Sequence, residues 1–324
     1  MTSIITEKTV QNIIGRRKRE IHKGDCGRIL IAAGSPGMAG AAILAARSAL
    51  RAGSGLVRTA IPAELFPIVQ VGVPEATCMR RNLPIQNLAA YDAVCVGPGL
   101  GEEEESIDFV KEILQVYEKT LIVDADGLNI IAHQNLFPLL HRRAELYPER
   151  TILTPHMGEA RRLLAASEPD AFDFSASASA SARERIADAL VRKTRAVIVL
   201  KGAGTIVAAE GMQTYTNTTG NPGMATGGSG DVLSGIITSL AGQRSQFATG
   251  LAPEMPIGQA NRTEDAAQAP EPAHIGAFDA ALAGVYIHGL AGDLAAHELG
   301  EYGVTAGDLA LYTAYAIKNI LNAK

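Results

Sequence analysis

The sequence lacks several features that would place it in other classes of protein. It has no Trp and only three Cys (Cys26, Cys78 and Cys95), an odd number without the spacing of a metal site. Such cysteine usage is typical of a reducing compartment and predicts a cytoplasmic location. The N-terminal residues lack the long apolar region of a signal peptide. No apolar run approaches the roughly 20 residues of a membrane helix, so we expect no membrane partner.

A concentrated positive charge is also missing. The formal net charge is −5 at pH 7, and the basic run at 16–19 is short. A run of this length is typical of a solvated face. Because phosphate backbones are bound through clustered Lys and Arg, we expect no nucleic-acid partner. Neither GxxxxGK[ST] nor a clean GxGxxG after the first predicted strand is present, so any nucleotide site must be of another kind.

Short apolar runs that end in turn residues recur along the chain, and such runs are typical of buried strands. The predicted strands are 28–33, 56–61, 93–96, 121–123, 151–153 and 196–200, then an antiparallel neighbour at 205–208 and a short strand at 213–216. The predicted helices include 39–52, 102–117, 231–242, 277–299 and 307–321. This alternation predicts an α/β fold with a doubly wound, mainly parallel sheet and helices on both faces.

Two segments interrupt the pattern. Residues 175–182 alternate between Ser and Ala, and residues 244–275 are rich in Pro, Ala, Gln and Glu with little periodicity. The first segment is either a mobile surface loop or the start of a helix, and the composition of the second favours a surface insertion. We therefore expect a single domain over 1–324 with surface insertions near 170–182 and 244–275, the second of them dispensable for folding.

Polar, glycine-rich loops follow five of the predicted parallel strands. They read GSPG at 34–37, GPGLG at 97–101, DADGLN at 124–129, TPHMGE at 154–159 and KGAG at 201–204. In open α/β sheets ligands bind along the carboxyl edge of the strands, where these loops would meet. The sequence therefore predicts a ligand site at that edge.

The most distinctive stretch is NTTGNPGMATGGSGD at 217–231, which runs into an apolar helical segment. Free N–H groups and the dipole at a helix N-terminus stabilise an anion, and glycine allows a ligand to approach the backbone. Asp231 beside such an anion hole suggests proton abstraction from a group that is being phosphorylated. An ordinary Ser or Asp N-cap is the alternative, but the other loops on the same edge favour a functional role.

The stretch NPGMATGGSGDVLSG at 221–235 resembles the signature of the NAD(P)H-hydrate dehydratases, which belong to the ribokinase-like superfamily. Similar segments follow the same order at 22–24, 34–41, 97–101, 124–129, 155–159, 201–205 and 284–293. The resemblance covers nearly the whole chain outside the two insertions. It implies an enzyme that restores NADH or NADPH from the S-epimer of its hydrated form, with ADP or ATP as co-substrate and Mg²⁺ as cofactor.

The resemblance also implies roles for individual residues. Asp231 would accept the proton of the substrate hydroxyl, while the N–H groups of Gly228, Ser229 and Gly230 stabilise the transferred phosphoryl group. Ser229 stands where Thr is common in the family. The nucleotide would be bound by Lys201, Gly202, Ala203, Gly204, Thr205 and Gly230. The hydrated-cofactor site would be lined by Ala41, Gly99, Gly101 and His156.

Several assignments have plain structural alternatives. Glu159 resembles the superfamily acid that organises Mg²⁺ through water, but it is equally a first-turn helix acid. Asp126 and Asn129 either orient the substrate or cap a helix. The segment 201–205 is alternatively a simple hairpin turn. His288 lies in an apolar segment, and we interpret it as a packed core residue.

Two other functions fit parts of the pattern. One is a ribokinase-like kinase of a small hydroxymethyl compound, and the other is a non-catalytic adenine-nucleotide sensor, against which the intact Asp231 argues. The expected partners are hydrated NADH or NADPH and an adenine nucleotide. The resemblance implies a homo-oligomer, with a tetramer as one form. Since about 27 residues precede the first predicted strand, we expect the epimerase activity found in many relatives to come from a separate chain.

Overall fold

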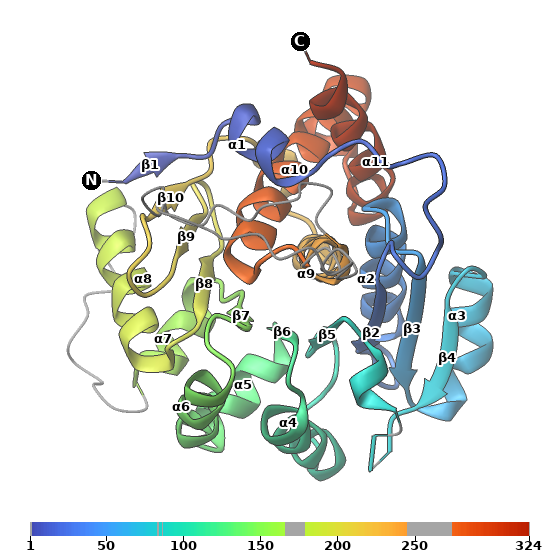
Figure 1. Ribbon diagram of the computed structural model, residues 1–324, viewed down its shortest axis with the longest axis vertical. Helices are drawn as coiled ribbons and strands as arrows, with labels where there is room; N and C mark the ends of the chain where they lie inside the picture. Colours follow the sequence, from blue (N-terminus) through green and yellow to red (C-terminus); the bar gives the residue numbers. More distant parts are fainter. Residues whose placement is uncertain (1, 83, 86, 166–178, 245–273, 324) are drawn as a thin grey trace, which may run out of the picture.

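A ten-stranded sheet organises the molecule, with strand order β1-β10-β9-β8-β7-β6-β5-β2-β3-β4 (Figure 1). The structure is a computed structural model, and it describes residues 2–82, 84–85, 87–165, 179–244 and 274–323. The strands are β1 Ser3–Ile4, β2 Arg28–Ala32, β3 Leu56–Ile61, β4 Thr77–Arg80, β5 Ala93–Val96, β6 Thr120–Val123, β7 Thr151–Leu153, β8 Val197–Leu200, β9 Ile206–Ala208 and β10 Tyr215–Thr216. Every pair from β4 across to β8 is parallel, whereas β9 is antiparallel to both β8 and β10.

Helices cover both faces of this sheet, as the sequence predicts. They are α1 Glu7–Ile13, α2 Ala39–Arg51, α3 Phe66–Gly72, α4 Glu104–Val116, α5 Asp126–His133, α6 Phe137–Leu146, α7 Met157–Ala165, α8 Ala180–Thr194, α9 Ser229–Gly242, α10 Ala277–Leu299 and α11 Ala306–Asn322. One apolar core joins the sheet to α2, α9, α10 and α11, and a second joins it to α4–α8. Within β5, Ala93 and Cys95 enter the first core while Val94 and Val96 enter the second, because successive side chains of a strand alternate.

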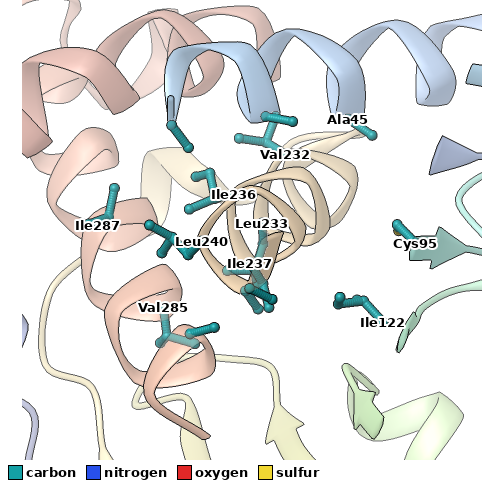
Figure 2. Close-up of a cluster of buried hydrophobic side chains, with 14 of the residues drawn as sticks. Ala45, Cys95, Ile122, Val232, Leu233, Ile236, Ile237, Leu240, Val285 and Ile287 are labelled. Atoms are coloured by element: carbon teal, nitrogen blue, oxygen red, sulfur yellow. The ribbon is translucent and has the colours of Figure 1, made fainter. Parts of the chain in front are cut away.

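Helix α9 lies at the centre of the first core, and every residue from Val232 to Gly242 is buried. Figure 2 shows Val232 facing α2, with Ile236 and Leu240 on the side of α10. Small residues permit these close crossings. A Cβ on Gly235 would stand 2.2 Å from the Ala45 carbonyl oxygen of α2, and a Cβ on Gly284 of α10 would stand 2.5 Å from Ile237. The packing holds α9 so that its N-terminus lies at the carboxyl edge of the sheet.

The structure adds elements that the sequence analysis does not predict, including β1, β4, α3, α6 and most of α8. It also starts α9 at Ser229, so that Asp231 lies inside the first turn instead of opening the helix. Of the first predicted insertion, Ala180 to Ala182 form the start of α8, and residues 170–178 lie outside the described residues. Of the second, residues 245–273 lie outside them, and its two ends meet where Arg244 pairs with His274 in a β-bridge.

Within the part of the chain that the structure describes, no helix combines the length and apolar character needed to cross a bilayer.

Candidate active site

Five of the loops singled out in the sequence lie on one edge of the sheet. They follow β2, β5, β6, β7 and β8, which are parallel and adjacent in the order β8-β7-β6-β5-β2. The N-terminus of α9 reaches the same edge, since a Cβ built on Gly230 would lie 3.3 Å from the Lys201 Nζ atom at the end of β8. The predicted convergence of loops and helix N-terminus is confirmed.

The first turn of α9 provides the backbone donors of an anion hole. Gly228 is the N-cap with φ +91°, a left-handed conformation that favours glycine. A Cβ at this position would also stand 2.4 Å from the Leu44 side chain. The N–H groups of Gly230 and Asp231 belong to the first turn and have no intrahelical acceptor. The Ser229 N–H instead donates to the Thr226 carbonyl at 3.3 Å, so this donor is shared with the loop.

The loop before this turn is fixed to α10. The Asp293 carboxylate accepts hydrogen bonds from the Gly220 N–H at 2.9 Å and the Asn221 side-chain amide at 3.0 Å. Glycines of α10 let the loop lie close, because a Cβ on Gly289 would stand 2.1 Å from Thr219 Oγ1 and one on Gly292 would stand 2.3 Å from the Met224 sulfur. These contacts give a physical reason for the segment GVYIHGLAGD at 284–293, in which the sequence analysis assigned a role only to His288.

A buried ion pair lies directly beneath Gly230. The Lys201 Nζ atom is 2.6 Å from Asp124 Oδ1 and 3.8 Å from Glu159 Oε2, with only 1% of the Asp124 side chain exposed. The Ser234 hydroxyl of α9 donates to Asp124 Oδ2 at 2.6 Å. Burial acts to lower the pKa of Lys201, but the carboxylates of Asp124 and Glu159 outweigh it and raise the pKa, so the ammonium stays charged.

The backbone around Asp124 is held tightly. A Cβ on Gly97, where φ is +126°, would come within 1.8 Å of the Asp124 carbonyl oxygen, so the β5 and β6 loops touch only because this residue is glycine. Ala125 adopts φ +47°, a sparsely populated conformation for a residue with a side chain. Sequence reasoning singled out Asp126 and Asn129 in this segment and missed Asp124. The signal was the charged residue that directly follows a buried strand.

The environment of Asp231 suits a general base. Burial and the Asp124 charge raise the pKa of Asp231 to about 7, although the Lys201 ammonium acts in the opposite direction. General bases work best when the pKa lies near the operating pH. The first turn of α9 thus carries a carboxylate that is basic enough to take a proton near neutral pH.

His156 and Glu159 form a compact unit after β7. The N–H of His156 donates to Glu159 Oε2 at 2.8 Å, and His156 Nε2 lies 3.4 Å from Glu159 Oε1. The Gly158 N–H donates to His156 Nδ1 at 2.9 Å, which leaves Nε2 as the protonated nitrogen. Burial, together with the Lys201 and Arg162 charges, lowers the pKa of His156, so the exposed imidazole is neutral.

The expected Mg²⁺ role of Glu159 is an indirect one, through water. Both of its carboxylate oxygens already have protein partners, and burial raises its pKa. Among the described residues, no three His, Cys, Asp or Glu side chains gather as a metal site. A contact through water to an ion carried by the nucleotide phosphates stays a prediction.

The segment 201–205 is a hairpin turn between β8 and β9 and also lies on the site edge. Gly202 and Gly204 have φ of +143° and +68°. The Thr205 hydroxyl donates to the Gly202 carbonyl at 2.9 Å, and Arg183 of α8 donates to the Leu200 and Ala203 carbonyls. The structure thus places Lys201 to Thr205 in one turn, and the sixth predicted nucleotide-binding residue, Gly230 of α9, lies next to Lys201.

The residues predicted to line the hydrated-cofactor site fall into two groups. Ala41 and Gly99 adjoin, since a Cβ on Gly99 would stand 2.9 Å from the Ala41 Cβ. Gly101 is next to them and donates its N–H to Asp126 Oδ2 at 2.8 Å. Asn129 accepts a hydrogen bond from Arg162 at 2.9 Å. Asp126 and Asn129 therefore support neighbouring protein groups, while His156 lies on the Glu159 side of the edge.

His288 is buried in α10, as the sequence interpretation expects, with 9% of its surface exposed. Burial lowers the pKa of His288 to about 4, so the ring is neutral. Its Nε2 atom also lies 3.4 Å from the Ser229 hydroxyl. The residue is thus both a core residue and a neighbour of the anion hole.

Known proteins resemble this chain in sequence and in fold. A family model described as NAD(P)H-hydrate dehydratase matches residues 29–314. The chain is 36% identical over 98% of its length to a bifunctional NAD(P)H-hydrate repair enzyme of Moorella thermoacetica, but it spans about half of that relative (54%). It is 32% identical to an ADP-dependent (S)-NAD(P)H-hydrate dehydratase of Neisseria meningitidis, with 92% of this chain and 88% of that relative covered.

A solved structure shows the same architecture. The ADP/ATP-dependent NAD(P)H-hydrate dehydratase of Bacillus subtilis, co-crystallised with ATP and Mg²⁺, matches with a TM-score of 0.75 at 26% identity. The match covers 98% of this chain and 99% of that one. The ribokinase-like fold expected from the sequence is therefore confirmed.

Proposed function

Since this chain belongs to the NAD(P)H-hydrate dehydratase family, we propose that it dehydrates the S-epimer of hydrated NADH or NADPH with ADP or ATP as co-substrate. The observation that carries the proposal is the position of Asp231. Its carboxylate has a pKa raised to about 7 and lies in the same helical turn as the backbone donors of an anion hole. A base and an anion hole side by side match the needs of phosphoryl transfer to a hydroxyl group.

In the first step, the Asp231 carboxylate removes the proton from the hydroxyl of the hydrated nicotinamide ring. The ring oxygen forms a bond to the terminal phosphorus of the nucleotide, and the bond from that phosphorus to the bridging oxygen breaks. The products are a phosphorylated hydrate and AMP when the donor is ADP. The N–H groups of the first turn stabilise the charge that develops on the phosphoryl oxygens.

In the second step, the C–O bond to the phosphorylated oxygen breaks and inorganic phosphate leaves. A proton is lost from the neighbouring ring carbon, and its electron pair forms the double bond of the nicotinamide. The net reaction converts hydrated NADH and ADP into NADH, AMP and phosphate. With ATP the nucleotide product is ADP.

Lys201 contributes a fixed positive charge to this site. Its ammonium lies next to Gly230. The Lys201 Nζ atom is 2.6 Å from Asp124 Oδ1, and this contact holds the ammonium in place. A cation at this place favours binding of the nucleotide phosphates and offsets negative charge on the group in transfer. Mg²⁺ bound to the nucleotide would supply further neutralisation of the phosphate charge when present.

The test is an assay of the purified protein with hydrated NADH, Mg²⁺ and either ADP or ATP. We expect the NADH absorbance to recover, with one phosphate and one AMP or ADP released per NADH formed. The proposal is contradicted if the NADH absorbance recovers with neither ADP nor ATP. Build-up of a stable phosphorylated product instead identifies a small-molecule kinase, and nucleotide binding without any reaction identifies a sensor.

Three other expectations stay predictions. They are the cytoplasmic location, the homo-oligomeric assembly and the supply of epimerase activity by a separate chain.

A further inference from the structure

Two loops meet at the predicted hydrated-cofactor side of the site. The 34–41 segment follows β2 and runs into the first turn of α2, and the 97–101 segment follows β5. The Gly34 N–H donates to the Pro98 carbonyl at 2.8 Å. Further along, a Cβ on Gly99 would stand 3.1 Å from the Met38 Cβ. The spacing between these loops therefore sets the position of Ala41, Gly99 and Gly101.

A buried arginine, Arg81, is connected to both loops by hydrogen bonds. Arg81 follows the edge strand β4, and only 6% of its surface is exposed. One of its terminal nitrogens donates to the Gly34 carbonyl at 2.8 Å. The other donates to the Ser106 hydroxyl at 3.4 Å, and that hydroxyl donates to the Leu100 carbonyl at 3.1 Å. Arg81 thus reaches the first loop directly and the second through Ser106.

This arrangement is costly for stability. The two acceptors of Arg81 are a neutral carbonyl and a neutral hydroxyl, and its Nε atom has no hydrogen-bond partner among the described residues. Burial lowers the pKa of Arg81, while Glu105 and Glu64 act in the opposite direction. A buried cation with incomplete partners is a poor source of folding energy. What the side chain supplies instead is a rigid planar guanidinium that forms hydrogen bonds toward two loops at once.

We propose that Arg81 is a positioning residue for the hydrated-cofactor site, because it fixes the separation of the 34–41 and 97–101 loops. The inference rests on the proposed function and assigns to that site a residue that acts through the two loops. It predicts that loss of Arg81 weakens binding of the hydrated cofactor. Binding of the nucleotide should not change, because the nucleotide site is built from β8, β9 and α9.

The first variant is Arg81→Met, which keeps much of the apolar stem and removes the guanidinium. We expect the KM for hydrated NADH to rise about tenfold, because misplaced loops lose binding contacts. The KM for ADP and the kcat should stay within about twofold, since the interactions lost are made equally in the ground and transition states. Arg81→Lys should fall between the wild type and Arg81→Met, because an ammonium can reach only one of the two loops.

Arg143 offers a matched control at the opposite end of the strands. It is 1% exposed and donates to the carbonyls of Tyr117, Lys119 and Arg150 and to the Thr151 hydroxyl. Arg143→Met removes the same kind of buried guanidinium and should lower the unfolding temperature without changing either KM. A rise in both KM values in Arg81→Met, or in neither, overturns the proposal.

Hydrogen exchange gives a readout that does not depend on the reaction. In Arg81→Met, the amides of Gly34, Met38 and Leu100 should exchange about tenfold faster, because their loops open more often. Amides of β8 and β9 should keep the wild-type rate. Ser106→Ala should speed exchange at Leu100 more than at Gly34, since it breaks only one arm. Unchanged exchange in both variants overturns the inference whether or not the wild type shows dehydratase activity. Local loss of protection in an active enzyme supports it, whereas the same loss without wild-type activity shows that Arg81 fixes the loops but that the proposed function is wrong.

Discussion

The Lys201 ammonium and the Asp124 carboxylate form an ion pair at 2.6 Å in which the carboxylate is almost completely enclosed. Removing one partner leaves a buried charge uncompensated. We expect Lys201→Met to lower the free energy of unfolding by about 3–5 kcal/mol. Adding Asp124→Asn should restore part of that loss, and urea unfolding of both single variants and the double variant measures the coupling. Strict additivity of the two single changes would show that the pair is not energetically linked.

The second prediction concerns the proposed base. Asp231→Asn keeps the shape of the side chain but cannot accept the proton, so kcat should fall about 10²–10⁴-fold. The dissociation constant for ADP, measured by calorimetry, should change little, because the backbone donors and Lys201 are intact. Asp279 is a matched control, since it is also an acid in the first turn of a helix and burial raises its pKa. Asp279→Asn should retain the wild-type kcat, and an equal loss in both variants contradicts the assignment.

The raised pKa of Asp231 predicts a pH dependence of both activity and stability. The value of kcat/KM should fall below about pH 7, where the carboxyl becomes protonated. In the unfolded chain this group loses its proton near pH 3.8, so ionisation costs folding energy as the pH rises from about 4 to about 7. Asp231→Asn should therefore be more stable than the wild type at pH 8, by about 1–4 kcal/mol, and nearly equal to it at pH 4. Urea unfolding at both pH values checks the sign.

His288 predicts the opposite trend at lower pH. Its folded pKa of about 4 lies below the ordinary value of 6.5, so the fold favours the neutral ring. The stability that this provides is present above pH 6.5 and is lost as the pH falls from 6.5 towards 4. His288→Gln has no such titration. The wild type should lose about 1–3 kcal/mol relative to the variant between pH 7 and pH 4, and parallel stability curves for the two proteins would refute the prediction.

Much of the fold follows from local patterns in the sequence. The strands β2, β3, β5, β6, β7 and β8 are short apolar runs that end in turn residues, and burial on both faces makes such runs easy to identify. The two strands that the sequence analysis does not predict, β1 and β4, lack this pattern. β4 is only partly buried and reads TCMR, and β1 has two exposed residues whose structure depends on pairing with β10. Tertiary pairing decides both, and a local pattern does not contain it.

Some residues of the candidate site can be predicted from local sequence, and others cannot. Asp231 and the glycines before it follow from their place at the start of an apolar helix. Asp124 and Arg81 do not, because their roles depend on contacts with residues 77 and 47 positions away in the chain. Asp126 belongs to a motif that the sequence shows, but its hydrogen bond from the Gly101 N–H depends on the meeting of two loops and could not be predicted. Its expected role in orienting the substrate stays a prediction.

The complete burial of α9 from Val232 to Gly242 limits how this protein can change. A mutational library aimed at a new substrate would gain little from the helix that carries Asp231, since each position from Val232 to Gly242 is enclosed and the glycine at 235 touches a neighbouring backbone. Useful diversity is confined to the loop tips along the sheet edge. We expect laboratory evolution to alter the specificity of this scaffold readily there while leaving the catalytic helix unchanged.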